Sequence, residues 1–229
     1  MAFSFIQFPF RFSIAGLQQD YKTCEEFGFQ LHHNTKDFTG DWTCLSLRSV
    51  DGTISNPHAF SIHGTYINTP LLKECPTIEN VMSHFHCDWE TIRLLKLDPG
   101  SVIHEHSDDG LGYEDGRFRI HVPILTNDDV EFVLDGKKVV MKEGECWYGN
   151  FNKPHSVANH GSTPRVHLVM DAIRNDWSDQ LFKELGYDFE AEHQLPVYDE
   201  ATKLQMIAHL QEMDTPVAKA LIQQLKGQA

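Results

Sequence analysis

The segment ETIRLLKLDPGSVIHEH (residues 90–106) predicts two β-strands joined by a tight turn. In this turn Pro99 fixes φ at the second position, and Gly100 accepts the positive φ that follows. Further short strands are expected downstream, over 118–125, 130–135, 137–141, 145–149, 155–159 and 165–171. Eight short strands in about 80 residues, separated by turn signals such as Asp135-Gly136, are typical of an antiparallel sandwich or barrel, and a jelly roll has this strand count.

The flanks of this region are expected to be partly helical. Residues 1–14 alternate apolar and polar side chains, and Pro9 would place this strand at a sheet edge. Another strand is expected over 41–49, and helices over 15–27, 76–85, the segment that ends at Gly186, 199–213 and 215–226. The class that follows is mainly β: a double-stranded β-helix core (jelly roll, cupin-like) with flanking helices and a short helical C-terminal appendage.

The expected domains are a jelly-roll domain over 1–189, with its metal core at about 90–172, and a helical appendage over 190–229.

A formal net charge of −14 argues against nucleic acid and anionic membranes as partners. Five cysteines without a CxxC pair indicate free thiols in a reducing compartment, so a cytoplasmic protein is expected. No run approaches the ~20 apolar residues of a membrane span. The expected partner is a small-molecule or peptide substrate, and the sequence does not indicate an oligomeric state.

His106-Ser107-Asp108 and the distant His155 form the pattern of a facial triad, in which two imidazoles and one carboxylate bind Fe(II). Three protein ligands leave adjacent coordination positions open for a bidentate co-substrate and O₂. The two ligands of a His-x-Asp motif point the same way because side chains alternate along an extended chain. We therefore expect these three residues to hold the metal and to be the catalytic residues.

A second His-x-Asp motif, His86-Cys87-Asp88, competes with this assignment, and His84 lies just before it. It falls at a helix-to-strand connection, outside the region of regular strands. We expect His84 and His86 to be surface or helix-end histidines.

His104 offers a different alternative. In a regular strand it would share a face with His106, which gives the His-x-His arrangement of a cupin, and the spacing of His155 and Asn159 fits the end of a cupin second motif. We expect His104 to pack inside the barrel instead, because Asp108 supplies the third ligand.

Arginine and histidine gather on one face of three expected strands, and apolar residues take the other face. The polar-face residues are Arg93, Arg117, Arg119, His121, Arg165 and His167. A solvent-exposed face would be the simple explanation. In an acidic protein, arginines on the strands that carry the metal motif favour an inward cationic lining, which suits a dicarboxylate because a guanidinium fork matches a carboxylate. This argument favours a functional role for Arg165 and Arg119 and leaves Arg93 and Arg117 open.

These motifs resemble the aspartyl/asparaginyl β-hydroxylase family of Fe(II)/2-oxoglutarate oxygenases. Within that family the chain looks most like the small enzymes that hydroxylate amino acids, including the cis-proline hydroxylases. The large membrane-anchored members lack the carboxylate ligand, whereas this chain has Asp108. The segments that carry the resemblance lie within about 90–172 and are LLKLDPGSVIHEHSD, RFRIHVPI, KEGECWYGNFNKPHSVANHG and PRVHLVMD.

The resemblance implies iron on His106, Asp108 and His155. It also implies Arg165 on the distal carboxylate of 2-oxoglutarate, Arg119 and His121 near the other end of this co-substrate, and Arg117 on the substrate side. Arg93 and Arg117 are more cations than 2-oxoglutarate needs, so the substrate is expected to carry a carboxylate.

The function expected is that of an Fe(II)/2-oxoglutarate-dependent dioxygenase, which uses O₂ to hydroxylate an unactivated C–H bond of an amino acid, free or within a peptide. Two alternatives remain open. One is a cupin-type metalloenzyme that uses His104, His106 and His155 without 2-oxoglutarate. The other is a non-catalytic jelly roll that binds an anion or a sugar.

Overall fold

The computed structural model describes residues 3–56, 58, 64–192, 199–213 and 215–227. The chain divides into two units, Met1–Asp188 and Phe189–Ala229. The second unit contains three helices, α4 (Phe189–Glu192), α5 (Glu200–Met213) and α6 (Pro216–Lys226). None of the helices in the described ranges combines the length and the apolar character needed to span a bilayer.

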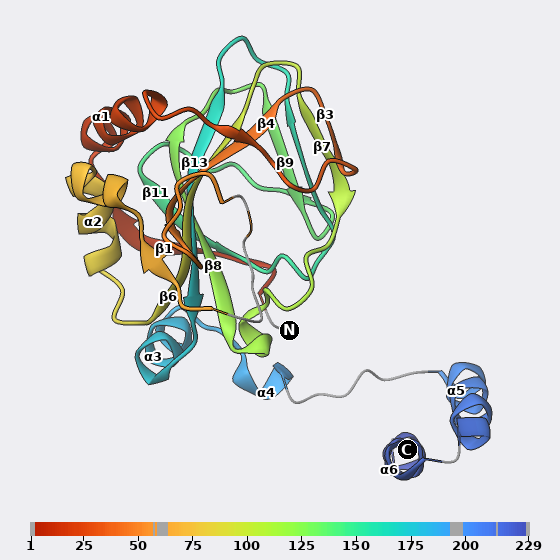
Figure 1. The fold of residues 1–229 in the computed structure, drawn as a ribbon. Coiled ribbons are helices and arrows are strands. Elements are labelled where there is room, and N and C mark those ends of the chain that lie inside the picture. The colour runs from red at the N-terminus through yellow and green to blue at the C-terminus, as the bar shows by residue number, and fades with distance from the viewer. Residues whose placement is uncertain (1–2, 57, 59–63, 193–198, 214, 228–229) are drawn as a thin grey trace. The chain divides into compact units, whose positions relative to one another are not determined.

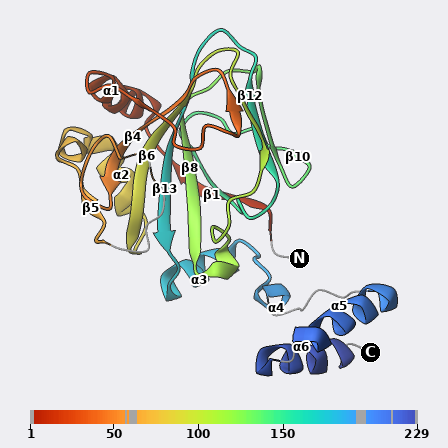
Figure 2. The same cartoon turned by 45° about the vertical axis from the view of Figure 1, so that its right-hand side comes forward.

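Two antiparallel sheets form the first unit (Figures 1 and 2). The larger sheet has the order β1-β11-β8-β13-β6-β4-β2, with β5 paired to β4, and the smaller has the order β10-β9-β12-β7-β3. The strands of the larger sheet are β1 (Phe5–Arg11), β2 (Gln30–Leu31), β4 (Trp42–Ser49), β5 (Ile67–Asn68), β6 (Trp89–Leu97), β8 (Arg117–Leu125), β11 (Glu145–Gly149) and β13 (Arg165–Ile173). Those of the smaller sheet are β3 (Phe38–Thr39), β7 (Val102–His106), β9 (Val130–Leu134), β10 (Lys137–Lys138) and β12 (His155–Asn159).

The expected jelly-roll class is confirmed, and β6 to β13 are the strands that the sequence predicts after residue 90. Asp135 and Gly136 both have positive φ, 53° and 69°, as a tight hairpin turn requires. The strand expected over 137–141 is shorter, because β10 ends at Lys138. Strand β1 lies at a sheet edge, and its pairing with β11 shifts register between Gln7 and Arg11, around Pro9.

The helices of the first unit bury the outer face of the larger sheet. They are α1 (Ile14–Glu25), α2 (Pro76–Ser83) and α3 (Asp176–Glu184), with 3₁₀ turns at Pro70–Glu74 and Tyr113–Asp115. Helices α1 and α2 lie on the side of this sheet away from the smaller sheet (Figure 1). Every residue of β13 except Ile173 is buried in consequence. The polar face of this strand therefore points into the barrel and not to solvent.

Asn159 joins three segments at the end of β12 opposite to His155. Its side-chain amide donates to the carbonyl oxygens of Leu97, at 3.1 Å, and Thr163, at 2.9 Å. Its Oδ1 accepts from the backbone N–H of Gly161 and from the side chain of Asn127, both at 3.2 Å. Asn159 is completely buried, so water cannot replace these partners.

We expect Asn159→Ala to lower the free energy of unfolding by about 2–4 kcal/mol, because it leaves several buried polar groups without partners. Urea denaturation should show a lower midpoint with an unchanged m-value. A loss below about 0.5 kcal/mol, typical of a surface substitution, would contradict this role.

Candidate metal centre and its pocket

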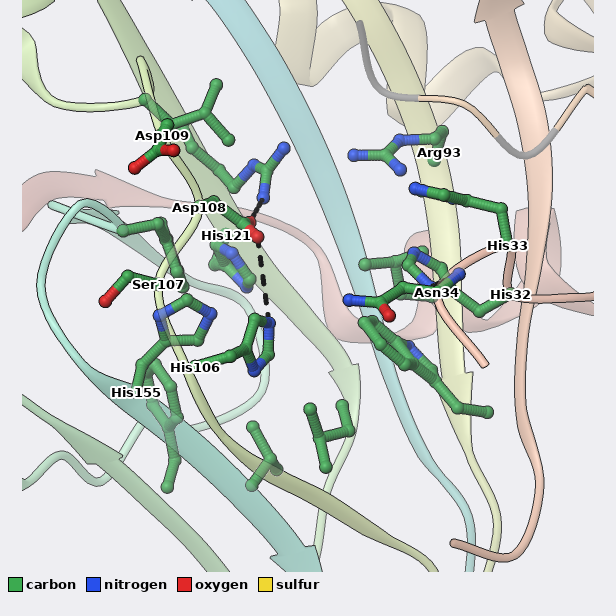
Figure 3. Close-up of a pocket in the computed structure, with 18 of the residues that line it drawn as sticks. His32, His33, Asn34, Arg93, His106, Ser107, Asp108, Asp109, His121 and His155 are labelled. Atoms are coloured by element: carbon green, nitrogen blue, oxygen red, sulfur yellow. Dashed lines mark hydrogen bonds and ion pairs between the residues drawn. The ribbon is translucent and has the colours of Figure 1, made fainter. Parts of the chain in front are cut away.

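A cavity of about 330 Å³ lies inside the barrel, next to the end of β7 and the start of β12 (Figure 3). Histidines, arginines and carboxylates line it together with an apolar wall. The polar lining residues are His32, His33, Asn34, His58, Arg93, His106, Ser107, Asp108, Asp109, Arg119, His121, His155 and Arg165. The apolar ones are Trp42, Leu95, Ile103, Leu111, Phe132, Phe151 and Val157.

Strand register brings the expected metal ligands together. His155 on β12 lies directly opposite His106 on β7. Ligand atoms of His106, Asp108 and His155 lie within 4.8 Å of one another, and within the described ranges no other group of three such residues is this close. Nε2 of His106 is 3.7 Å from Oδ1 of Asp108. Two imidazoles and one carboxylate on one side of a cavity form the donor set of a facial triad.

Backbone carbonyl groups fix both imidazoles. Nδ1 of His106 is 2.8 Å from the carbonyl oxygen of His104, and Nδ1 of His155 is 3.0 Å from that of Lys153. A carbonyl oxygen only accepts, so each Nδ1 carries the hydrogen and each Nε2 keeps its lone pair for a metal. Burial lowers the pKa of His155 to about 4, which keeps this ring neutral near pH 7.

Asp108 is held through both its backbone and its carboxylate. Its backbone N–H donates to the carbonyl of Phe151 at 2.9 Å, and its Oδ2 accepts from Nη1 of Arg119 at 2.8 Å. The remaining donors of Arg119 bind Asp171, at 2.6 Å from Nε and 3.2 Å from Nη2. Burial alone would lower the pKa of Arg119, but the two carboxylates outweigh it and raise this pKa. Arg119 thus directly contacts an expected metal ligand.

Arg165 is buried in the cavity wall without a carboxylate partner among the described residues. It is 3% exposed, its Nη2 donates to Nδ1 of His167 at 3.1 Å, and its Nε has no hydrogen-bond partner. Burial lowers the pKa of Arg165 to about 9. His121 lies beside this group, with its Nδ1 3.3 Å from Nδ1 of His167. Burial holds the pKa of both histidines well below the ordinary value, so Arg165 carries the charge of this group.

The wall across the cavity from His106 and His155 comes from a segment that the sequence analysis did not assign to the site. Figure 3 shows His32, His33, Asn34 and Arg93 on that side. His32 stacks on Trp42, with ring centroids 3.5 Å apart and planes at 14°, and burial lowers the pKa of His32 to about 2. The sequence feature that could have pointed to this wall is the abundance of histidine, with 14 residues, several of them in pairs.

Asp171 is a second site residue that the sequence analysis missed. It is 1% exposed and binds both Arg119 and Arg93, with Nη2 of Arg93 at 3.3 Å. Burial would raise the pKa of Asp171, but the two guanidinium groups outweigh it and lower this pKa. Asp171 lies on the same face of β13 as Arg165 and His167, so the same alternation reaches it two steps further, after Val169.

Arg117 does not line the cavity. Its Nε donates to Glu90 at 2.8 Å, and its side chain is 32% exposed. It occupies the first position of β8, before the strand enters the barrel. The structure therefore brings Arg93, Arg119, His121 and Arg165 to the cavity but leaves Arg117 outside it.

The expectation for His104 is wrong, because a β-bulge interrupts β7. His155 pairs with His106, but Val157 pairs with Ile103, so β7 has one residue more than β12 between these pairs. Ile103 and His106 consequently both line the cavity, and His104 is exposed. The cupin-type alternative, with His104, His106 and His155 as ligands, therefore loses His104.

The other His-x-Asp motif lies on the outside, as expected. His84 and His86 are exposed. His84 is the C-cap of α2 and bonds to the carbonyl of Asn80, while His86 stacks on Trp177.

Comparisons with known proteins agree with this geometry. The sequence model of the aspartyl/asparaginyl beta-hydroxylase family matches residues 14–175. The L-proline cis-4-hydroxylase of Rhizobium meliloti (strain 1021) is 30% identical over 164 residues, which are 70% of this chain and 58% of that protein. The chain thus spans little more than half the length of this relative.

Among solved structures, an oxidoreductase of the 2OG-Fe(II) oxygenase family from Burkholderia pseudomallei has the same fold. It aligns with a TM-score of 0.52 at 12% identity, over 76% of this chain and 86% of its own. The family match covers all of β6 to β13 and the relative aligns over more than two thirds of the chain, so the protein belongs to the aspartyl/asparaginyl β-hydroxylase family.

Proposed function

We propose that the protein is an Fe(II)/2-oxoglutarate-dependent dioxygenase that hydroxylates an unactivated C–H bond of an amino acid, free or within a peptide. One observation carries the proposal: the same cavity is lined by the His106, Asp108 and His155 cluster and by the buried Arg165, which has no carboxylate partner among the described residues. We also propose a cytoplasmic location for the protein, which is supported by its five cysteines, all present as free thiols.

The donor set fits Fe(II). His106 and His155 present Nε2 lone pairs, Asp108 presents a carboxylate oxygen, and three ligands on one side leave the other coordination positions to small molecules. When bound, the metal supplies the redox chemistry in which O₂ oxidises 2-oxoglutarate to succinate and CO₂ and a C–H bond becomes C–OH. The protein fixes the ligand atoms before the metal arrives, because both imidazoles are already held by carbonyl groups.

Arg165 fits the distal carboxylate of 2-oxoglutarate. A buried guanidinium without a counter-charge is costly, and a carboxylate from a ligand would satisfy both its charge and its unused Nε–H. His121 lies next to it on the cavity wall.

The buried charged groups of the site favour a substrate with its own carboxylate. Arg93, Arg119 and Arg165 are all buried, whereas Asp171 is the one carboxylate buried with them and Asp108 is 31% exposed. Arg93 lies across the cavity from the triad (Figure 3), which supports it as the cation for a substrate carboxylate. The L-proline hydroxylase relative supports an amino acid.

The metal assignment is tested by single substitutions. His106→Ala, Asp108→Ala and His155→Ala should each abolish hydroxylation and the visible charge-transfer band that forms on anaerobic addition of Fe(II) and 2-oxoglutarate, because a facial site does not tolerate the loss of one ligand. His86→Ala and Asp88→Ala are the matched controls and should retain both. The reverse result would show that the second His-x-Asp motif holds the metal.

Arg165→Ala should weaken 2-oxoglutarate binding by about 2–5 kcal/mol, the usual cost of removing one member of a desolvated charge pair. Arg165→Lys should restore only part of the affinity, because a point charge cannot form the fork. Anaerobic titration of the iron-loaded protein measures both dissociation constants. An unchanged constant in the alanine variant would place the co-substrate elsewhere.

Arg93→Ala should leave 2-oxoglutarate binding near normal but uncouple the reaction, since the oxidant would form without a positioned C–H bond. The measurement is succinate formed per hydroxylated product, once a substrate has been found by screening amino acids. Arg117→Ala should keep the wild-type ratio, because Arg117 lies outside the cavity. A ratio near unity in Arg93→Ala would remove Arg93 from the substrate site.

A further inference from the structure

A buried carboxylate, that of Asp171, binds two of the arginines that line the cavity, Arg119 and Arg93. It comes from β13, which runs between β8 and β6 in the larger sheet. Arg119 is its direct cross-strand partner on β8. Arg93 on β6 lies opposite Val169, one step away on the same face of the sheet. This register brings two arginines from two neighbouring strands onto one carboxylate, within reach of diagonal pairing.

The contacts of Asp171 fix the orientation of Arg119. Nε and Nη2 of Arg119 bind the two carboxylate oxygens at 2.6 and 3.2 Å, and this fork fixes the plane of the guanidinium. Its remaining nitrogen, Nη1, points to Asp108 at 2.8 Å. Thr91 donates to Oδ2 of Asp171 at 2.6 Å, and Arg93 donates to the same oxygen at 3.3 Å, so two further donors hold the carboxylate itself.

We propose that Asp171 is a positioning residue of the metal centre: through Arg119, it holds the Asp108 carboxylate in the orientation in which this carboxylate binds iron. The inference rests on the proposed function, because it takes Asp108 as an iron ligand.

Charge gives a second reason for this arrangement. An isolated Arg119 would be a full cation 2.8 Å from a metal ligand and would compete with the metal for the same carboxylate. Paired with Asp171, Arg119 has part of its charge compensated, while its Nη1 still directs Asp108. Partners that orient a metal ligand in this way typically change metal affinity about 10–100-fold.

The test is titration of the metal-free protein with Co(II) alone, under anaerobic conditions and without 2-oxoglutarate, followed by visible absorption. Asp171→Asn keeps the shape of the side chain but replaces one carboxylate oxygen with an amide N–H₂, and a guanidinium has no acceptor for it, so the two-bond fork to Arg119 is lost. We expect its dissociation constant for Co(II) to rise about 10–100-fold.

Glu90→Gln is the matched control. It also removes a buried carboxylate, 5% exposed, from an arginine of the same sheet, but the pair of Glu90 and Arg117 lies outside the cavity. Both variants lose an ion pair. If Asp171 had only a structural role, both substitutions would lower the melting temperature and neither would change the affinity for Co(II). Glu90→Gln should bind Co(II) with wild-type affinity.

A folded Asp171→Asn protein with wild-type Co(II) affinity overturns the proposal, and so does an equal loss of affinity in Glu90→Gln. If Asp171→Asn does not fold, Arg119→Lys decides instead, because lysine keeps the charge but cannot hold Asp171 and Asp108 together. Weaker Co(II) binding in Arg119→Lys supports the proposal, and wild-type binding overturns it. A wild-type protein that binds no Co(II) overturns the proposed function as well, so the two failures are distinguishable.

Discussion

Charged groups in the barrel interior have little access to water, and each needs a partner inside the protein. Replacing buried ion pairs with apolar residues of similar volume is often neutral or stabilising, so their presence between two sheets is better explained by ligands than by stability. Arg93 and Arg119 share Asp171, and Arg119 also binds Asp108. Arg165 is the exception, held by a neutral histidine. The part of the cavity with uncompensated charge is therefore the part that an anionic ligand would complete.

A second constraint is the pairing of β12 with β7. It sets two histidines directly opposite each other, and the bulge in β7 turns Ile103 and His106 to the same side. A regular strand would have placed His104 in the cavity with His106. The bulge therefore leaves a carboxylate, Asp108, and not a third histidine as the third residue of the proposed metal site, and it brings an apolar residue, Ile103, into the cavity lining.

Much of this architecture could be predicted from the sequence, because strands and turns are local. Alternation and turn residues predicted β6 to β13, and His106-Ser107-Asp108 predicted a metal motif from adjacent residues. A bulge has no residue signature of its own, so the side of His104 was predicted wrongly. The placement of Arg117 depends on Glu90, an ion pair that spacing does not show. The wall around His32 comes from a distant segment, and only the folded chain brings it to the cavity.

The origin of that wall has an evolutionary consequence. The residues of the proposed metal site and the arginines of the barrel lie on β6, β7, β8, β12 and β13 or just after them, where strand pairing and mutual hydrogen bonds fix them. His32, His33 and Asn34 instead belong to the segment between β2 and β3, which is joined to β7 through the backbone, since the carbonyl of Asp37 accepts from the N–H of His104 at 2.7 Å. Substitutions of these three side chains can reshape the wall of the cavity while the strand pairing that sets His155 opposite His106 stays intact, so the shape of the cavity and the geometry of the proposed metal site are free to diversify independently.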